Sequence, residues 1–184
     1  MNGVKEFVPV LIPSKNVPEI LRVLESAPQE ATMTVTKNQI SFNYEGVYLT
    51  SRVVEGVFPD YKQIIPKEHK TKAVLLKQDI VEAFKTVIIF SDKFNKLSVK
   101  VRPTEKKMEL STKNSDVGEN VTAIEASVEG EDVDINFNYR YIADCFQSIE
   151  SDSISFDFGG LSKPLMIHGI NDRSFTYIVM PINK

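Results

Sequence analysis

The spacing of hydrophobic and polar positions changes along this chain, and the same change occurs three times. Each time, a short apolar stretch is followed by apolar residues at spacing i, i+3, i+4, i+7, which predicts an amphipathic helix. Next come stretches in which apolar and polar residues alternate, and this period of two predicts strands. The copies begin at intervals of roughly 60 residues, near Phe7, Ala73 and Val133. This repetition predicts an architecture built from three copies of one module.

The three predicted helices cover residues 16–26, 77–90 and 138–150. Each is apolar on one side only, which is typical of a helix that packs on a sheet. Asn16 and Asn138 are placed to cap the first and third helices. The apolar stripes comprise Val17, Ile20, Leu21 and Leu24 in the first helix, Ile80, Phe84, Val87 and Ile88 in the second, and Ile142, Cys145, Phe146 and Ile149 in the third.

The predicted strands form short antiparallel sets around each helix. They cover residues 7–12, 32–36, 40–44 and 47–54 in the first copy, 73–76, 97–101, 108–112 and 121–128 in the second, and 133–137, 153–158, 164–168 and 175–180 in the third. Gly159 and Gly160 predict a turn between two of the last strands. Helices on one side of largely antiparallel sheets make the expected fold class α+β.

Residues 58–70 fit neither period and are the one candidate boundary between domains. Pro59 and Pro66 bracket this stretch, which contains no glycine or serine and several apolar residues. A segment of that composition is expected to be an ordered linker and not a flexible one.

The composition is that of an ordinary globular protein, with 42% hydrophobic and 26% charged residues among 184. The net charge of −3 is only a weak argument against nucleic-acid binding, because the placement of the basic residues on the surface matters more than the net charge. The single cysteine, Cys145, lies on an apolar helix face and is expected to be a buried thiol in a reducing compartment. The cytoplasm is therefore the expected location.

The sequence contains no pattern that predicts catalysis. There is no glycine-rich phosphate loop, His69 and His168 lack neighbours at metal-ligand spacing, and no serine occupies a strand–turn–helix elbow. We therefore expect no enzyme activity, no metal and no cofactor, and a binding or scaffolding role. Met180 near the C-terminus suits contacts with varied partners, although a strand that completes the core has the same pattern.

Three stretches, in this order, resemble one known family. They are residues 52–66 with Gly-Val-Phe-Pro-Asp-Tyr, residues 137–141 with Phe-Asn-Tyr-Arg-Tyr, and residues 177–181 with Tyr-Ile-Val-Met-Pro. As a set they resemble the bacterial replicative sliding clamp, the beta subunit of DNA polymerase III. The resemblance implies the DNA-clamp fold and a processivity factor of DNA replication, in which two subunits of three domains form a ring around DNA.

A complete subunit of that family contains six modules, so the resemblance implies that this chain is a C-terminal fragment. Residues 1–61 would be the second half of the middle domain, and residues 62–184 a complete C-terminal domain. Such a chain would lack part of the peptide pocket and could not close a ring in the family's way. The alternative is a structural interaction module that keeps the fold without ring or DNA function.

The resemblance also implies a hydrophobic pocket that takes a short peptide bearing glutamine and then leucine or phenylalanine. The DNA polymerase III catalytic subunit, the clamp loader, other polymerases and repair proteins bind there in the family. Gln63 and Asn183 stand where arginine is common, which should weaken the grip on polar peptide groups. The pocket residues would be Pro59, Gln63, Ile64, Asn138, Tyr141, Ser162, Pro164, Ile178, Val179, Met180, Pro181 and Ile182.

Two further surfaces follow from the resemblance. Lys15 and Arg22 would face double-stranded DNA and contact phosphates without reading bases. Ile89 and Phe90 would form the ring interface of the homodimer. The alternatives are a solvated lysine and arginine for the first pair, and core residues at a helix end for the second, an alternative that is stronger for Ile89.

Overall fold

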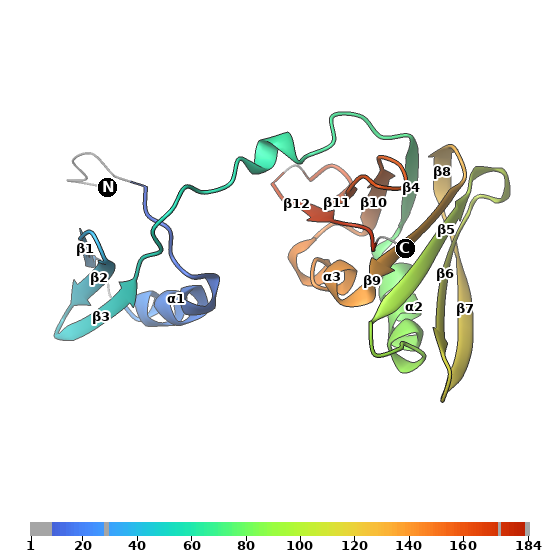
Figure 1. Cartoon of the computed structure of the whole chain (residues 1–184). Coiled ribbons are helices and arrows are strands. Elements are labelled where there is room, and N and C mark those ends of the chain that lie inside the picture. Colours follow the sequence, from blue (N-terminus) through green and yellow to red (C-terminus); the bar gives the residue numbers. More distant parts are fainter. Residues whose placement is uncertain (1–8, 28–29, 173, 183–184) are drawn as a thin grey trace. The chain divides into compact units, whose positions relative to one another are not determined.

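The computed structural model describes residues 9–27, 30–172 and 174–182. The chain divides into two compact units, Met1–Asp60 and Tyr61–Lys184, here called the first and second unit (Figure 1). The first part of the predicted strand at 7–12, and Asn183, lie outside the described residues.

The first unit contains one helix and one three-stranded sheet. Helix α1 (Val17–Glu25) follows a 3₁₀ turn, and strands β1 (Thr32–Val35), β2 (Gln39–Tyr44) and β3 (Val47–Arg52) form an antiparallel meander. The predicted helix and the strands predicted at 32–36, 40–44 and 47–54 are confirmed, whereas the described residues 9–12 of the strand predicted at 7–12 form only an isolated bridge between Leu11 and Val54. The predicted cap is not confirmed, because the Asn16 amide donates to Ser51 Oγ at 3.0 Å and caps nothing.

The core of the first unit is small. Ile20, Ile40 and Phe42 are buried, with partly buried neighbours around them. The predicted stripe of α1 is only half covered, because Val17 is exposed and Leu21 is 55% exposed. A single module therefore leaves part of its apolar helix face open to solvent.

The second unit contains two modules. Its strands are β4 (Thr71–Leu76), β5 (Lys96–Arg102), β6 (Lys107–Asn114), β7 (Gly118–Glu125), β8 (Ser127–Gly130), β9 (Val133–Asn138), β10 (Ser153–Phe158), β11 (Leu165–Gly169) and β12 (Thr176–Val179), and its helices are α2 (Lys77–Ile89) and α3 (Tyr139–Ala143). Short 3₁₀ turns cover Tyr61–Gln63, Pro103–Glu105 and Phe146–Ser148.

The two modules of the second unit exchange their first strands. The sheets have the orders β7-β6-β5-β9 and β12-β11-β10-β4-β8, and all pairs are antiparallel. Strand β4 precedes α2 but pairs with β10 of the following module, and β9 precedes α3 but pairs with β5 of the preceding one (Figure 1). Each meander is thus extended by a strand from the other module.

The helix stripes of both modules are buried together in one core. Phe84 of α2 and Phe146, which follows α3, meet edge to face with ring centroids 5.0 Å apart. Edge-to-face contact is a favourable geometry for two aromatic rings. The predicted stripe of α2 is wrong at Ile88, which is exposed, whereas Ala83 is buried in its place.

The third predicted helix is shorter than its pattern suggested. Asn138 Oδ1 accepts the Arg140 N–H at 3.0 Å, which confirms the predicted cap, but α3 ends at Ala143. The Cys145 N–H and thiol then both bond to Ile142 O, and the chain continues as a 3₁₀ turn. The apolar spacing 142, 145, 146, 149 fits both kinds of helix, so it did not distinguish them.

The strand predicted at 121–128 is two strands in two different sheets. Strand β7 pairs with β6, whereas β8 pairs with β4 in the other sheet. The chain changes sheets at Ala126, whose N–H donates to Lys106 O at 3.0 Å. The alternation of residue types continues across this point, so the period alone hides the change of partner.

We expect Gly130→Ala to lower the free energy of unfolding of the second unit by about 3 kcal/mol or more. Gly130 has φ +110°, and an added Cβ would lie 2.0 Å from Lys70 O, in the backbone paired across from it. Gly160→Ala is the matched control, because Gly160 has φ +124° but no neighbour nearer than 3.9 Å. Urea titration followed by circular dichroism tests this, and equal decreases for the two variants would contradict it.

Candidate peptide-binding surface and basic positions

Strand β12 lies at one edge of the five-stranded sheet and carries the conspicuous C-terminal residues. It pairs with β11 in the register Leu165↔Val179 and Met166↔Ile178. Continuing this register by one pair places Pro164 opposite Met180. Beyond β12, the Ile182 N–H donates to Asn136 O at 2.8 Å, so the C-terminal segment lies against the end of β9.

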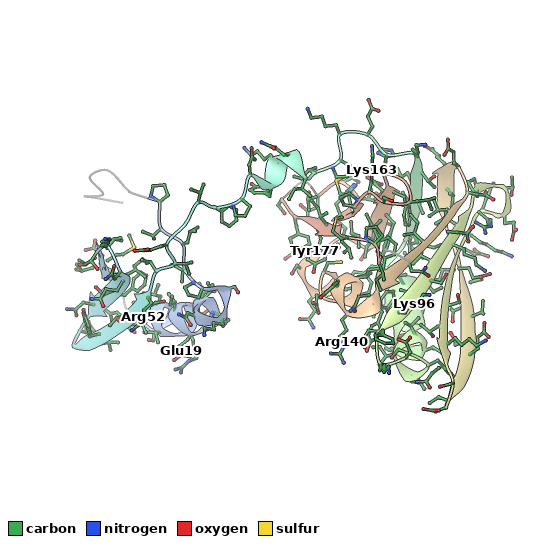
Figure 2. The ribbon with its side chains drawn as sticks, in the orientation of Figure 1. Glu19, Arg52, Lys96, Arg140, Lys163 and Tyr177 are labelled. Carbon is green, nitrogen blue, oxygen red and sulfur yellow. The ribbon has the colours of Figure 1, made fainter. Side chains whose placement is uncertain are left out.

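The start of α3 lies next to this segment. Strand β9 leads from Asn136 into the helix cap at Asn138, and Tyr141 follows on the first turn. Burial, first of all, and then the nearby Asp144, Cys145 and Tyr141 raise the pKa of Tyr177 on β12, whose side chain packs against the core that contains Ile142 and Cys145. Figure 2 labels Tyr177 on β12 and Arg140 on α3.

Large apolar side chains are exposed on this surface. Met180 is 56% and Tyr141 57% exposed, and Ile182 is also exposed. Asn138, Pro164, Ile178 and Pro181 are half-buried around them. The Ile182–Asn136 hydrogen bond holds the C-terminal segment near the start of α3, and the strand register places Pro164 opposite Met180. We call the set Asn138, Tyr141, Pro164, Ile178, Met180, Pro181 and Ile182 the Met180 surface.

Val179 does not belong to this surface, which corrects the prediction. It is 2% exposed and forms part of the core opposite Leu165. Successive strand residues point to opposite faces, so Val179 faces inward while Ile178 and Met180 face outward. Its side chain is not available to a partner.

The remaining predicted pocket residues lie in loops. Ser162 is exposed in the turn closed by the Lys163 N–H and Gly160 O at 3.2 Å, which confirms a turn after Gly159 and Gly160. Gln63 and Ile64 are exposed at a 3₁₀ turn of the second unit, and Pro59 is an exposed residue of the first unit.

Sequence reasoning missed Met166. It is half-buried on β11 directly opposite Ile178 and therefore shares the outward face with Pro164 and Met180. The alternation of residues along β11 already indicated that Met166 and Pro164 share one face. Only the register between β11 and β12 shows that this face also carries Ile178 and Met180.

His168 has a partner that its sequence position did not reveal. Its Nε2 lies 3.1 Å from Asp157 Oδ2, and Ser155 Oγ donates to Asp157 Oδ1 at 2.5 Å. The Asp157 carboxylate lies between the Ser155 hydroxyl and the His168 imidazole, so His168 is not placed to accept the serine proton. Nucleophilic catalysis by serine would require that proton transfer. The cluster is a hydrogen-bond network between neighbouring strands β10 and β11, in which Ser155 and Asp157 are buried and His168 is half-buried.

The two predicted DNA-facing residues differ in their surroundings. Arg22 donates to both Glu19 oxygens, at 2.5 and 3.0 Å, and this hydrogen bonding lowers the pKa of the Glu19 carboxyl. Lys15 is exposed just before α1 and, in the described part of the chain, forms no ion pair. Lys15 therefore offers an uncompensated positive charge, whereas that of Arg22 is balanced locally.

The predicted ring-interface pair lies at the end of α2. Ile89 is 62% exposed, so the alternative that it belongs to the core is wrong. Phe90 is half-buried, and a Cβ on Gly118 would lie 3.9 Å from its ring. Within residues 9–27, 30–172 and 174–182, no helix is long and apolar enough to span a membrane, and no three acidic, histidine or cysteine residues gather to bind a metal.

Comparison with known proteins accounts for both units. A family model described as the C-terminal domain of the DNA polymerase III beta subunit matches residues 62–183, and the model of its central domain matches residues 2–60. The chain belongs to the DNA polymerase III beta subunit family. The expected family and the DNA-clamp fold are thereby confirmed.

Individual members of the beta subunit family agree with this assignment. The beta sliding clamps of Bacillus subtilis and Caulobacter vibrioides are 26% and 29% identical to the chain over 94% of its length. The crystal structure of the beta subunit from Thermotoga maritima matches 98% of the chain with a TM-score of 0.84 and 31% identity. The chain spans about half of these relatives, 46% of the two clamps and 49% of the T. maritima chain.

We expect Cys145 to be unreactive toward Ellman's reagent in the native protein. The side chain is fully buried, and burial raises the pKa of the thiol to about 12. The unfolded thiol ionises near its ordinary pKa of about 8.5, so this group costs stability as pH rises from that value toward about 12. Thiol titration in buffer and in guanidinium chloride tests this, and rapid labelling of the folded protein would contradict it.

Proposed function

We propose that this chain serves in DNA replication as part of a sliding clamp that holds partners on DNA through short peptides. Residues 1–61 would be the second half of the middle domain and residues 62–184 the complete C-terminal domain. The family segments 2–60 and 62–183 support this division. The partners would be the DNA polymerase III catalytic subunit, the clamp loader, other polymerases and repair proteins, in the cytoplasm.

The exposed Met180 surface is the observation that carries the proposal. An exposed methionine and an exposed isoleucine just after the edge strand β12, together with the exposed Tyr141 on α3, offer apolar area to a peptide. Methionine adapts its shape to different side chains, which suits several partners. Burying two peptide side chains contributes about 1.5–3 kcal/mol each, less the cost of ordering the peptide, which gives weak and exchangeable binding.

Met180→Ala is expected to weaken binding of a labelled Gln-Leu-x-Leu-Phe peptide about five- to thirtyfold, because it removes the apolar area that the methionine offers to the peptide. Its melting temperature should stay close to that of the unchanged chain, since Met180 is exposed. Val121→Ala is the matched control, because Val121 is 54% exposed on β7, in the other sheet. Fluorescence anisotropy measures the affinity.

Two outcomes would contradict the peptide proposal. Equal decreases in affinity for Met180→Ala and Val121→Ala would show that binding does not involve the Met180 surface. No peptide binding by the unchanged chain would favour the alternative, a structural interaction module that keeps the fold without this function.

The second part of the proposal concerns DNA. Lys15 and Arg22 would lie toward double-stranded DNA and contact phosphates in a sequence-independent way, while Ile89 and Phe90 would join neighbouring subunits in a complete ring. Because Glu19 pairs with Arg22, Lys15 is the stronger candidate for phosphate contact. Each phosphate that a basic residue neutralises contributes about 0.9 to the slope of log affinity against log salt.

Lys15→Ala is expected to lower double-stranded DNA affinity and reduce the salt slope by about 0.9, whereas Arg22→Ala should change it less. Glu19→Gln should raise the affinity, because it removes a negative charge and releases the guanidinium. Anisotropy titrations at several salt concentrations measure both quantities. A larger decrease in affinity for Arg22→Ala than for Lys15→Ala would contradict the assignment.

A further inference from the structure

Two basic side chains border the Met180 surface, although the chain as a whole carries a net charge of −3. Lys96 and Lys163 are both exposed, and neither forms an ion pair with any residue that the structure describes. Figure 2 labels both lysines, one at the start of β5 and one in the β10–β11 connection. The strand registers place them on opposite sides of the Met180 surface.

Lys96 lies on the side of α3. It is the direct partner of Asn138 across β5 and β9, so these two side chains share one face of the sheet. The next pair along the ladder is buried, which shows that Lys96 and Asn138 face outward. The Ile182 N–H reaches β9 from its other side, at Asn136 O. Adjacent strands are about 4.8 Å apart, so the Lys96 backbone lies about 10 Å from the line of the C-terminal segment.

Lys163 lies on the opposite side, in the β10–β11 connection. Continuing the β10–β11 register by one pair places Gly159 opposite Pro164. A Cβ on Gly159 would lie 3.0 Å from Lys163 Cβ and 3.3 Å from its Cδ, so the aliphatic stem of Lys163 lies along Gly159. Because Pro164 is itself opposite Met180, two strand spacings, about 10 Å, separate Met180 from Gly159.

The carboxylates near these lysines already have partners. Asp134 on β9 accepts two hydrogen bonds from Arg102, at 2.9 and 3.0 Å. Asp144 follows Arg140 by four residues, a spacing at which opposite charges offset each other. Two further carboxylates in this part of the second unit are paired with Lys70 and His168, namely Glu131 and Asp157. The two lysines therefore retain their full charge beside an apolar surface.

We propose that the Met180 surface selects peptides in which acidic residues flank the apolar side chains, with Lys96 and Lys163 attracting the two acidic ends. This inference rests on the proposed function of that surface. Charges act over about 8–10 Å at moderate ionic strength, so each lysine attracts a carboxylate without direct contact. Charges at the border of an interface mainly steer association and set its salt dependence.

The separation of the two lysines fits a short extended peptide. Four strand spacings, about 20 Å along the surface, lie between them, and an extended chain covers this distance in about six residues. A five-residue Gln-Leu-x-Leu-Phe core with one acid at each end has this length. A peptide is the occupant we commit to, because exposed apolar side chains separate the two lysines, whereas phosphates are bound by a continuous basic patch or stripe.

Three labelled peptides test the selection, each with the Gln-Leu-x-Leu-Phe core and with Asp, Asn or Lys at both ends. In about 20 mM salt the Asp peptide is expected to bind about tenfold more tightly than the Lys peptide, with the Asn peptide between them. The ratio should approach one in about 0.5 M salt, where the charges are screened. Stopped-flow fluorescence should place most of the difference in the association rate.

Variants of the two lysines test the assignment. Lys96→Gln and Lys163→Gln should each lower the affinity for the Asp peptide about two- to threefold and leave the Asn peptide unchanged. Lys96→Glu combined with Lys163→Glu should reverse the preference in favour of the Lys peptide, a result that loss of structure cannot produce. Lys106→Gln is the matched control, because Lys106 is exposed, forms no ion pair with a described residue and lies beyond the other end of β5.

The outcomes separate this inference from the proposed function. Equal affinities of the three peptides at low salt would overturn the inference alone, since the surface would still bind peptides. Absence of binding for all three would overturn the proposed function and this inference with it. Equal effects of Lys106→Gln and Lys96→Gln would contradict the inference, because only net charge would then matter. Displacement of the Asp peptide by a DNA duplex, abolished by Lys96→Gln, would instead assign the lysines to nucleic acid and contradict the inference.

Discussion

The exchange of first strands between modules is the interaction on which the rest of the second unit depends. Strands β4 and β9 each fill a place in the sheet of the other module, and alternate residues of both are buried. The exchange holds the two helix stripes against a common core, where Phe84 and Phe146 meet. The first unit shows the module without this partner, with a smaller core and an exposed Leu21.

This dependence explains what the apolar spacing could and could not predict. The stripe of α1 has the same spacing as that of α2, and the helix forms where the pattern predicts it. Burial of Leu21 nevertheless requires a second module, and period alone contains no information on the partner. For the same reason, the break at Ala126 was invisible, because alternation persists while the hydrogen-bonding partner changes.

The candidate site was predicted to a similar extent. Met180 and Tyr141 are exposed as a binding surface requires, whereas Val179 faces the core. A period of two predicts that consecutive residues of a strand face opposite sides of the sheet. Only the pairing of Val179 with Leu165 decides which of the two sides faces the core. Met166 and the Asp157–His168 contact were missed because they depend on register between strands. The short α3 was missed because Tyr-Arg-Tyr-Ile is a weak helix former whose spacing also fits a 3₁₀ turn.

The Met180 surface and the lysines at its border differ in the forces they use. Lys96 and Lys163 act through space and are screened by salt, which favours partners with acidic ends. The Met180 surface offers flexible apolar contacts, which favour many partners at low affinity. Weak apolar contacts of this kind exchange readily, because each side chain that a peptide buries contributes only about 1.5–3 kcal/mol before the cost of ordering the peptide.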